Sequence, residues 1–237
     1  MSKVLVIPDV HLKPWMFDQA KEIMVNTDIE RAVCVGDLVD DWNCEEEVDL
    51  YEKTLNKAID FAKNYPSSLW CYGNHDLSYL WDQYDHPGYS VSASDVVCDM
   101  LETLRDTLES PDNIGIIHKV DNTLFSHAGL SYEFVEQQFP QEMDIECMID
   151  MINDFGVEEL WEVNSPIWVR PQDWTLAKGM FPDDLFQVVG HTPVSEVFEQ
   201  DNMITVDTFS TYSNGQPIGN REFCWVDTVK KTWGYFE

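Results

Sequence analysis

Val4-Leu5-Val6-Ile7-Pro8-Asp9-Val10-His11 is the stretch that indicates the fold of this chain most clearly. It opens with four consecutive apolar residues, three of them β-branched, a pattern that is typical of a strand buried on both faces. Asp9 and His11 follow this strand directly, so we expect them where a strand ends and a loop begins. Open α/β sheets bind their ligands at that edge. The stretch therefore predicts an α/β protein with a polar site at the carboxyl end of its first strand.

A strand followed by a metal-ligating side chain recurs along the chain. Ala32-Val33-Cys34-Val35 precedes Asp37, and Gln187-Val188-Val189 precedes His191. Four of the six histidines belong to short motifs of this kind. In chain order the motifs are Asp9-Val10-His11, Gly36-Asp37-Leu38-Val39-Asp40, Gly73-Asn74-His75-Asp76, Ser126-His127-Ala128-Gly129 and Gly190-His191-Thr192.

The residue types in these motifs indicate a particular chemistry. Carboxylate, imidazole and amide oxygen suit manganese, iron or zinc in a mixed nitrogen–oxygen site, with no need for thiolate. One carboxylate can bridge two ions, which together clamp the attacking and leaving oxygens of a displacement at phosphorus and turn bound water into hydroxide near neutral pH. Each motif alone is weak, because Gly-Asp and Gly-Asn also occur in ordinary turns. The five in one order favour a metal site over coincidence.

The series D-x-H, G-D-x-x-D, G-N-H-D, H-A-G and G-H-T resembles the calcineurin-like metallophosphoesterases, and among them the phosphoprotein-phosphatase type. The resemblance runs from Asp9 to about Asp207. G-H-T in place of G-H-x-H favours the branch of bacterial and phage-like Ser/Thr phosphatases and dinucleoside-tetraphosphatases. The family fold implied is an α/β sandwich of two mixed β-sheets flanked by helices. Asp207, in Val206-Asp207-Thr208, is given a structural role.

The resemblance implies a role for each motif residue. His75 resembles the general acid that protonates the leaving oxygen, and Asp40 resembles the carboxylate that orients it. A carboxylate partner raises the basicity of an imidazole and fixes its tautomer, so this pairing is chemically reasonable. The implied metal ligands are Asp9 and His11 for the first ion, Asp37 as the bridge, and Asn74, His127 and His191 for the second ion.

These roles imply a metal-dependent phosphoric-ester hydrolase with two divalent ions, for which we favour manganese over iron or zinc. The expected substrate is a phosphomonoester, either phosphorylated Ser or Thr in a protein or a small-molecule phosphate, attacked by metal-bound hydroxide. One alternative is a dinucleoside-tetraphosphatase or phosphodiesterase that uses the same site. The other is a non-catalytic binding module of the same fold, which the complete set of motif ligands disfavours.

One departure concerns phosphate binding. The family pattern G-D-x-x-D-R-G places an Arg where this chain has Asp41, followed by Trp42. A carboxylate cannot replace a guanidinium that binds phosphate with two hydrogen bonds. Arg170, in Trp168-Val169-Arg170, resembles the W-x-R stretch of bacterial and phage-type relatives. We expect Arg170 to bind phosphate, with a surface ion pair as the alternative.

Composition narrows the class of protein. The chain has 237 residues and a net charge of −30, which disfavours extended nucleic-acid binding and anionic membranes. No apolar run is long enough to span a membrane, and the start of the chain lacks a secretory pattern, so we expect a cytoplasmic protein. The six cysteines are scattered and are expected to be reduced.

Apolar spacing and turn residues outline the elements along one expected domain, 1–237, with a lid-like insertion at about 77–112. In this insertion, aromatic residues such as Trp81, Tyr84, His86 and Tyr89 are expected to pack in the core or line a substrate cleft. The predicted helices cover about 15–24, 94–108, 131–138 and 144–154, and one more follows the acidic stretch Glu45-Glu46-Glu47 and runs to about 64. The predicted strands lie near 4–8, 32–36, 69–72, 114–118, 123–126, 187–190, 203–206 and 223–227.

Overall fold

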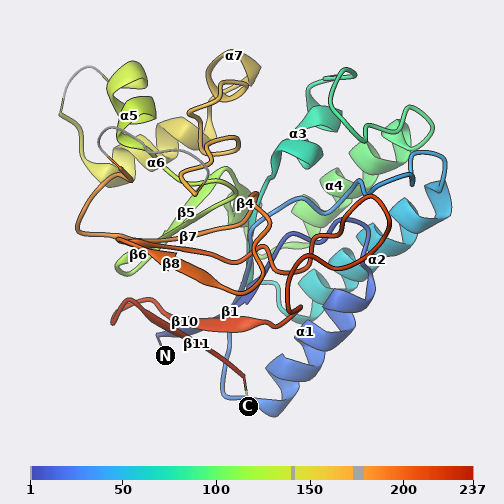
Figure 1. The fold of residues 1–237 in the computed structure, drawn as a ribbon, viewed down its shortest axis with the longest axis horizontal. Helices are drawn as coiled ribbons and strands as arrows, with labels where there is room; N and C mark the ends of the chain where they lie inside the picture. Colours follow the sequence, from blue (N-terminus) through green and yellow to red (C-terminus); the bar gives the residue numbers. More distant parts are fainter. Residues whose placement is uncertain (1, 140–141, 173–178, 237) are drawn as a thin grey trace.

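The computed structural model describes residues 2–139, 142–172 and 179–236, and its core is a sandwich of two mixed β-sheets flanked by helices (Figure 1). The predicted fold class is thereby confirmed. The first sheet has the order β11 (Thr232–Tyr235), β10 (Cys224–Asp227), β1 (Lys3–Ile7), β2 (Ala32–Cys34), β3 (Leu69–Cys71) and β4 (Ile114–Gly115). The second has the order β5 (Ile117–Val120), β6 (Thr123–Ser126), β7 (Phe186–Val189), β9 (Met203–Thr205) and β8 (Phe198–Gln200).

Both sheets are parallel in part, and antiparallel strands lie at one edge of the first sheet and at both edges of the second. In the first sheet β1 to β4 run parallel, and β10 and β11 add antiparallel pairs beside β1. In the second sheet β6, β7 and β9 run parallel, and β5 and β8 are antiparallel to their neighbours. Parallel neighbours end at the same edge, so the loops after β1, β2 and β3 emerge together, as do those after β6 and β7.

Helices cover the outer faces of both sheets (Figure 1). Their packing follows from amphipathic spacing, since the buried residues of each long helix lie on one side. On the first sheet lie α1 (Trp15–Asn26), α2 (Val48–Asn64) and α4 (Ser94–Thr107). On the side of the second sheet lie α5 (Tyr132–Gln138) and α6 (Ile145–Asn153). The short elements are α3 (Asn74–Leu80), η1 (Pro111–Asn113) and α7 (Val157–Leu160).

Strand β1 is buried on both faces, as its sequence predicts. Val4 and Val6 belong to the cluster between the two sheets, whereas Leu5 and Ile7 belong to the cluster under α1, α2 and α4. All four side chains are at most 3% exposed. Alternate side chains of a strand point to opposite faces, so a run that is apolar throughout is required only where both faces are covered.

The single strand predicted at 114–118 is wrong. The chain forms β4 in the first sheet, breaks at Ile116, and continues as β5 in the second sheet. The side chain of Asn153, at the end of α6, takes the place of strand partners at this break. Its Oδ1 accepts the N–H groups of Ile116 and Ile117 at 2.7 and 3.0 Å, and its Nδ2 donates to the Ile117 carbonyl at 3.0 Å. A partner 36 residues away cannot be read from local apolar spacing.

The region 77–112 combines a helix of the main layer with a loop near the site. Leu101 and Leu104 of α4 are fully buried in the same apolar cluster as α2, so this helix is part of the cover of the first sheet. The loop 81–93 lies between α3 and α4. Within it Tyr89 stacks on Tyr79 with ring centroids 4.4 Å apart, whereas Tyr84 is 62% exposed. The lid-like insertion expected at about 77–112 therefore stays a prediction for the loop 81–93 alone.

The cysteines and the length of the helices bear on two expectations drawn from composition. All six cysteines are free thiols, as expected. Among the described residues, no helix combines the length and the apolar character that crossing a membrane requires.

We predict that Asn153→Ala destabilises the protein by about 1–2 kcal/mol, because it leaves two backbone N–H groups and one carbonyl at the sheet junction without protein partners. Urea unfolding monitored by circular dichroism measures the change. Asn64→Ala is the matched control, since the Asn64 side chain makes one exposed bond to the carbonyl of Asp60 within α2. Equal stability of the two variants would contradict the role given to Asn153.

Candidate metal centre

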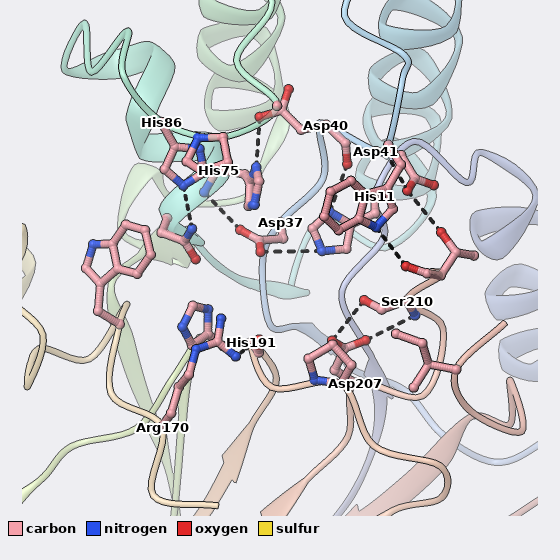
Figure 2. Close-up of a pocket in the computed structure, with 18 of the residues that line it drawn as sticks. His11, Asp37, Asp40, Asp41, His75, His86, Arg170, His191, Asp207 and Ser210 are labelled. Carbon is pink, nitrogen blue, oxygen red and sulfur yellow. Dashed lines mark hydrogen bonds and ion pairs between the residues drawn. The ribbon is translucent and has the colours of Figure 1, made fainter. Parts of the chain in front are cut away.

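The residues expected from the motifs converge at one edge of the sandwich (Figure 2). They lie on the loops after β1, β2, β3, β6 and β7, and α3 begins within one of the motifs. Most of them line a pocket of about 370 Å³, with Asp9 and His127 fully buried beside it. The expected residues that line the pocket are His11, Asp37, Asp40, Asn74, His75, Arg170 and His191.

Asp37 lies between the two expected groups of ligands. Its Oδ2 is 3.6 Å from Nε2 of His11 and 3.2 Å from Nε2 of His127. Its Oδ1 accepts the backbone N–H of His75 at 3.0 Å. Asp37 is shared by two clusters of possible metal ligands, one with His11 and His75 and one with His127 and His191. One carboxylate is therefore within reach of both groups.

Around His127 several electron-pair donors face one another. Its Nδ1 lies 2.9 Å from the carbonyl oxygen of Val35, so this nitrogen carries the proton and donates. In the neutral ring Nε2 is then a lone-pair atom, and it faces Oδ1 of Asn74 at 2.9 Å and Nδ1 of His191 at 3.1 Å. With Oδ2 of Asp37 also close, these lone pairs repel one another unless a cation or a proton lies among them.

Two further atoms of the expected metal ligands are buried without a hydrogen-bond partner. They are Oδ1 of Asp9 and Nε2 of His191. Buried polar atoms are normally satisfied, and a metal ion bound among these carboxylates and imidazoles would satisfy both atoms. The donor set of carboxylate, imidazole and amide oxygen also suits divalent ions of the first transition row. The residues at this site therefore fit the metal ions that the sequence implied.

Glycines in the motifs make room for the carboxylates. A Cβ atom at Gly73 would lie 2.0 Å from Oδ1 of Asp37, and one at Gly190 would lie 1.9 Å from Oδ1 of Asp9. No side chain fits at either position. These glycines are required by close approach, because each one faces a carboxylate that belongs to a different motif.

Several site residues have left-handed backbone conformations. The φ angles of His11, Asp37, Asp40 and His191 are 43, 49, 61 and 63°. Residues with a Cβ atom rarely adopt this region, and such strain is concentrated at functional sites in proteins. Hydrogen bonds between the loops hold these strained conformations. The N–H groups of Val10 and His11, for example, donate to the carbonyl of Asp37 at 3.0 and 2.8 Å.

His75 and Asp40 form the pair that the motifs suggested. Nδ1 of His75 is 2.8 Å from Oδ2 of Asp40, which leaves Nε2 as the nitrogen that can exchange a proton with a bound molecule. The hydroxyls of Tyr51 and Tyr79 both donate to the other oxygen of Asp40, at 2.8 and 2.6 Å. Burial acts to lower the pKa of His75, but the carboxylates of Asp37 and Asp40 outweigh it and raise that pKa.

The electrostatics of the buried ligands follow from their crowding. Burial would lower the pKa of His127, yet the carboxylates of Asp37 and Asp9 raise it to about 9. Burial and the charge of Asp207 raise the pKa of Asp9. In the protein without metal, protons therefore compensate part of the negative charge that cations would otherwise balance.

Arg170 and Asp41 both line the pocket but have different partners. Nη1 of Arg170 donates to the carbonyl of His191 at 3.0 Å and to Oγ1 of Thr192 at 3.3 Å. These bonds hold the guanidinium beside the site. Asp41 forms an ion pair of 2.9 Å with Nζ of Lys13, and burial opposes but does not prevent the lowering of its pKa by this lysine.

Other residues at the site were not assigned there from the sequence. Tyr51 and Tyr79 contact Asp40, but a Tyr at a helical position also fits simple core packing. Asp76, adjacent to His75, accepts the N–H groups of Leu38 and Gly73 at 2.9 Å and so fixes two of the loops. Asp207 accepts two bonds from Ser210, in line with a structural role, and also lines the pocket.

His86 joins the loop 81–93 to the site. Its Nε2 is 2.8 Å from Nδ2 of Asn74, and because an amide nitrogen only donates, this ring nitrogen is the acceptor. Its ring lies edge to face with that of His75, centroids 4.2 Å apart, and also contacts Trp161 and Trp168. The sequence marked His86 only as one of several residues that could line a cleft.

Comparison with known proteins agrees with this geometry. The model of the calcineurin-like phosphoesterase family matches residues 2–216. No curated protein matches the chain significantly. A cold-active protein tyrosine phosphatase is similar in structure, with a TM-score of 0.57 and 17% identity over 100% of this chain and 79% of its own.

A protein serine/threonine phosphatase from Saccharomyces cerevisiae is similar as well, with a TM-score of 0.56 and 17% identity over 95% of this chain and 72% of its own. At such identities the two structures establish a shared fold. The family match covers nearly the whole chain and every motif of the pocket. The chain therefore belongs to the calcineurin-like phosphoesterase family.

Proposed function

We propose that this protein is a phosphatase that hydrolyses phosphomonoesters with the help of two divalent metal ions, manganese being favoured. One observation carries the proposal. The electron-pair donors around Asp37 are buried and crowded, two atoms beside them (Oδ1 of Asp9 and Nε2 of His191) have no hydrogen-bond partner, and the group adjoins a His–Asp pair in the same pocket. A metal site beside a proton donor is what hydrolysis of a phosphate ester requires.

The residues would divide the metal ions between two groups. When bound, the ions supply Lewis-acid polarisation of a water molecule and of the phosphoryl oxygens. Asp37 is shared because its carboxylate approaches the imidazoles of both groups. As the resemblance implies, we assign Asp9, His11 and Asp37 to the first ion and Asp37, Asn74, His127 and His191 to the second; Asp37 is common to one cluster with His11 and another with His127 and His191.

His75 would donate a proton to the leaving oxygen. Asp40 accepts from Nδ1, so Nε2 is the donor, and the two tyrosine hydroxyls fix the carboxylate itself. Arg170 would bind the phosphate through the nitrogens of its guanidinium that are not used by the His191 carbonyl and Thr192. These roles need no movement of the chain, because Asp40, His75 and Arg170 already line the pocket.

The substrate is proposed to be a phosphoprotein or a small phosphate ester. Both structural neighbours are named as protein phosphatases, so phosphopeptides belong in any substrate panel. Turnover restricted to dinucleoside polyphosphates or phosphodiesters would instead identify the alternative activity at this site. Metal binding without any turnover would identify a binding module.

Asp37→Asn should reduce the content of bound metal below two ions per chain and abolish most turnover, because an amide offers one neutral oxygen where the carboxylate offers two charged ones. Elemental analysis after gel filtration, together with hydrolysis of a phosphomonoester, measures both effects. Asp18→Asn, an exposed carboxylate on α1, is the control. Two ions per chain with normal turnover in Asp37→Asn would exclude the bridging role.

His75→Asn should slow hydrolysis of alkyl phosphates about a hundredfold or more while sparing aryl phosphates, whose leaving oxygen needs little protonation. The comparison is the ratio of kcat for the two ester types, with metal content measured in parallel. His118→Asn is the matched control, because His118 is buried in β5 and bonded to the Trp70 carbonyl, outside the pocket. Equal losses on both ester types would argue against a proton donor.

His86→Ala should weaken the binding of one metal ion about tenfold or more and leave the other unchanged, because Asn74 loses the acceptor that turns its oxygen toward His127. His86→Gln should restore binding, since its amide oxygen also accepts. Titration calorimetry with Mn²⁺ on the metal-free protein measures the affinity of each of the two binding steps, one for each metal ion. Identical isotherms for the wild type and His86→Ala would show that Asn74 is oriented without His86.

A further inference from the structure

Asp41 and Trp42 line the pocket at the two positions where the family pattern has Arg-Gly. Both carboxylate oxygens of Asp41 have partners within the protein. Its Oδ2 is paired with Lys13, and its Oδ1 accepts from the N–H of Trp42 at 2.8 Å and from Oγ1 of Thr211 at 3.0 Å. This segment therefore contributes no cation for phosphate, and it places an indole at the pocket instead.

Trp42 is held in place although it is exposed. Its Nε1 donates to the carbonyl of Thr211 at 2.8 Å, and the neighbouring Asn43 donates to the carbonyl of Ser213 at 3.3 Å. These bonds fix the loop after β2 to the loop after β9. The side chain lines the pocket and remains 60% exposed. An indole whose only polar atom is bonded leaves its ring faces for contact with another apolar or aromatic group.

Several other residues that line the pocket are uncharged or negative. Pro87 and Gly88 from the loop 81–93 are among them, together with Pro193 and Ile218, and Glu45 adds a carboxylate. Among the described residues that line the pocket, Arg170 is the one side chain with a permanent positive charge. A single phosphoryl group is thus accommodated, whereas a second phosphate on the leaving group would face carboxylates without a compensating cation.

We infer that Trp42 forms a binding subsite for the leaving group and that its ligand is a planar, uncharged aryl ring, so that aryl phosphates are the substrate class of this enzyme. The inference rests on the proposed phosphatase function and names its substrate. The ring could belong to a phosphotyrosine side chain or to a small aryl ester, which share this chemistry. Aromatic contacts of this kind change affinity by up to about tenfold.

Inhibition constants of phosphonates test the subsite without turnover of the probe. Phenylphosphonate and methylphosphonate share the phosphoryl mimic, and only the first has a ring. In the Mn²⁺-loaded protein, Trp42→Ala should weaken phenylphosphonate about tenfold more than methylphosphonate, and Trp42→Phe should restore the difference. Tyr212→Ala is the matched control, because Tyr212 is an exposed aromatic on the adjacent loop that does not line the pocket.

The outcomes separate the inference from the proposed function. Equal weakening of both phosphonates in Trp42→Ala, or the same selective effect in Tyr212→Ala, overturns the aryl subsite and leaves the phosphatase proposal intact. If neither phosphonate binds and no phosphomonoester is hydrolysed, both the aryl subsite and the proposed phosphatase function are overturned. A phosphonate analogue of phosphotyrosine within a peptide distinguishes the sources. Tighter binding than phenylphosphonate supports a protein substrate, and equal binding supports a small aryl ester.

Discussion

The crowding of lone pairs around Asp37 sets the conditions that every other part of the site has to meet. The carboxylate is only 2% exposed, and it adjoins imidazoles of His11 and His127 that belong to separate motifs. Such a set is costly to bury unless cations or protons compensate it. The divalent ions of the proposed function would remove the conflict. The metal dependence proposed for this site would thus also account for why these donors lie together.

The sandwich supplies the rigidity that this arrangement needs. The loops that carry the candidate ligands follow parallel strands whose side chains are buried on both faces, so the strand ends have little freedom. Left-handed backbone at His11, Asp37 and His191 persists because bonds between loops fix it. Gly73 and Gly190 permit contacts that any side chain would block. Strained backbone and close packing therefore occur together at the edge of the sandwich that carries the site.

The helical layer and the loop 81–93 contribute to the site from outside the motifs. Tyr51 of α2 and Tyr79 of α3 reach the same oxygen of Asp40, so the packing of two helices sets the orientation of the His75 partner. His86 reaches Asn74 from the loop. On the opposite side, Asp41 and Trp42 connect to the loop after β9. In the proposed function, substrate selection and metal geometry would therefore depend on elements far apart in the chain.

Most strands and helices, and the candidate ligands, could be predicted from local sequence. Apolar runs define buried strands, and chain connectivity fixes which residues follow them, so the sequence alone places Asp9, Asp37 and His191 at a sheet edge. The split at Ile116, the partners of Asp40 and the contact of His86 with Asn74 depend instead on how the chain folds in three dimensions. Each of these involves a side-chain bond between separate segments of the chain, and such bonds leave no periodic pattern in the residues that make them.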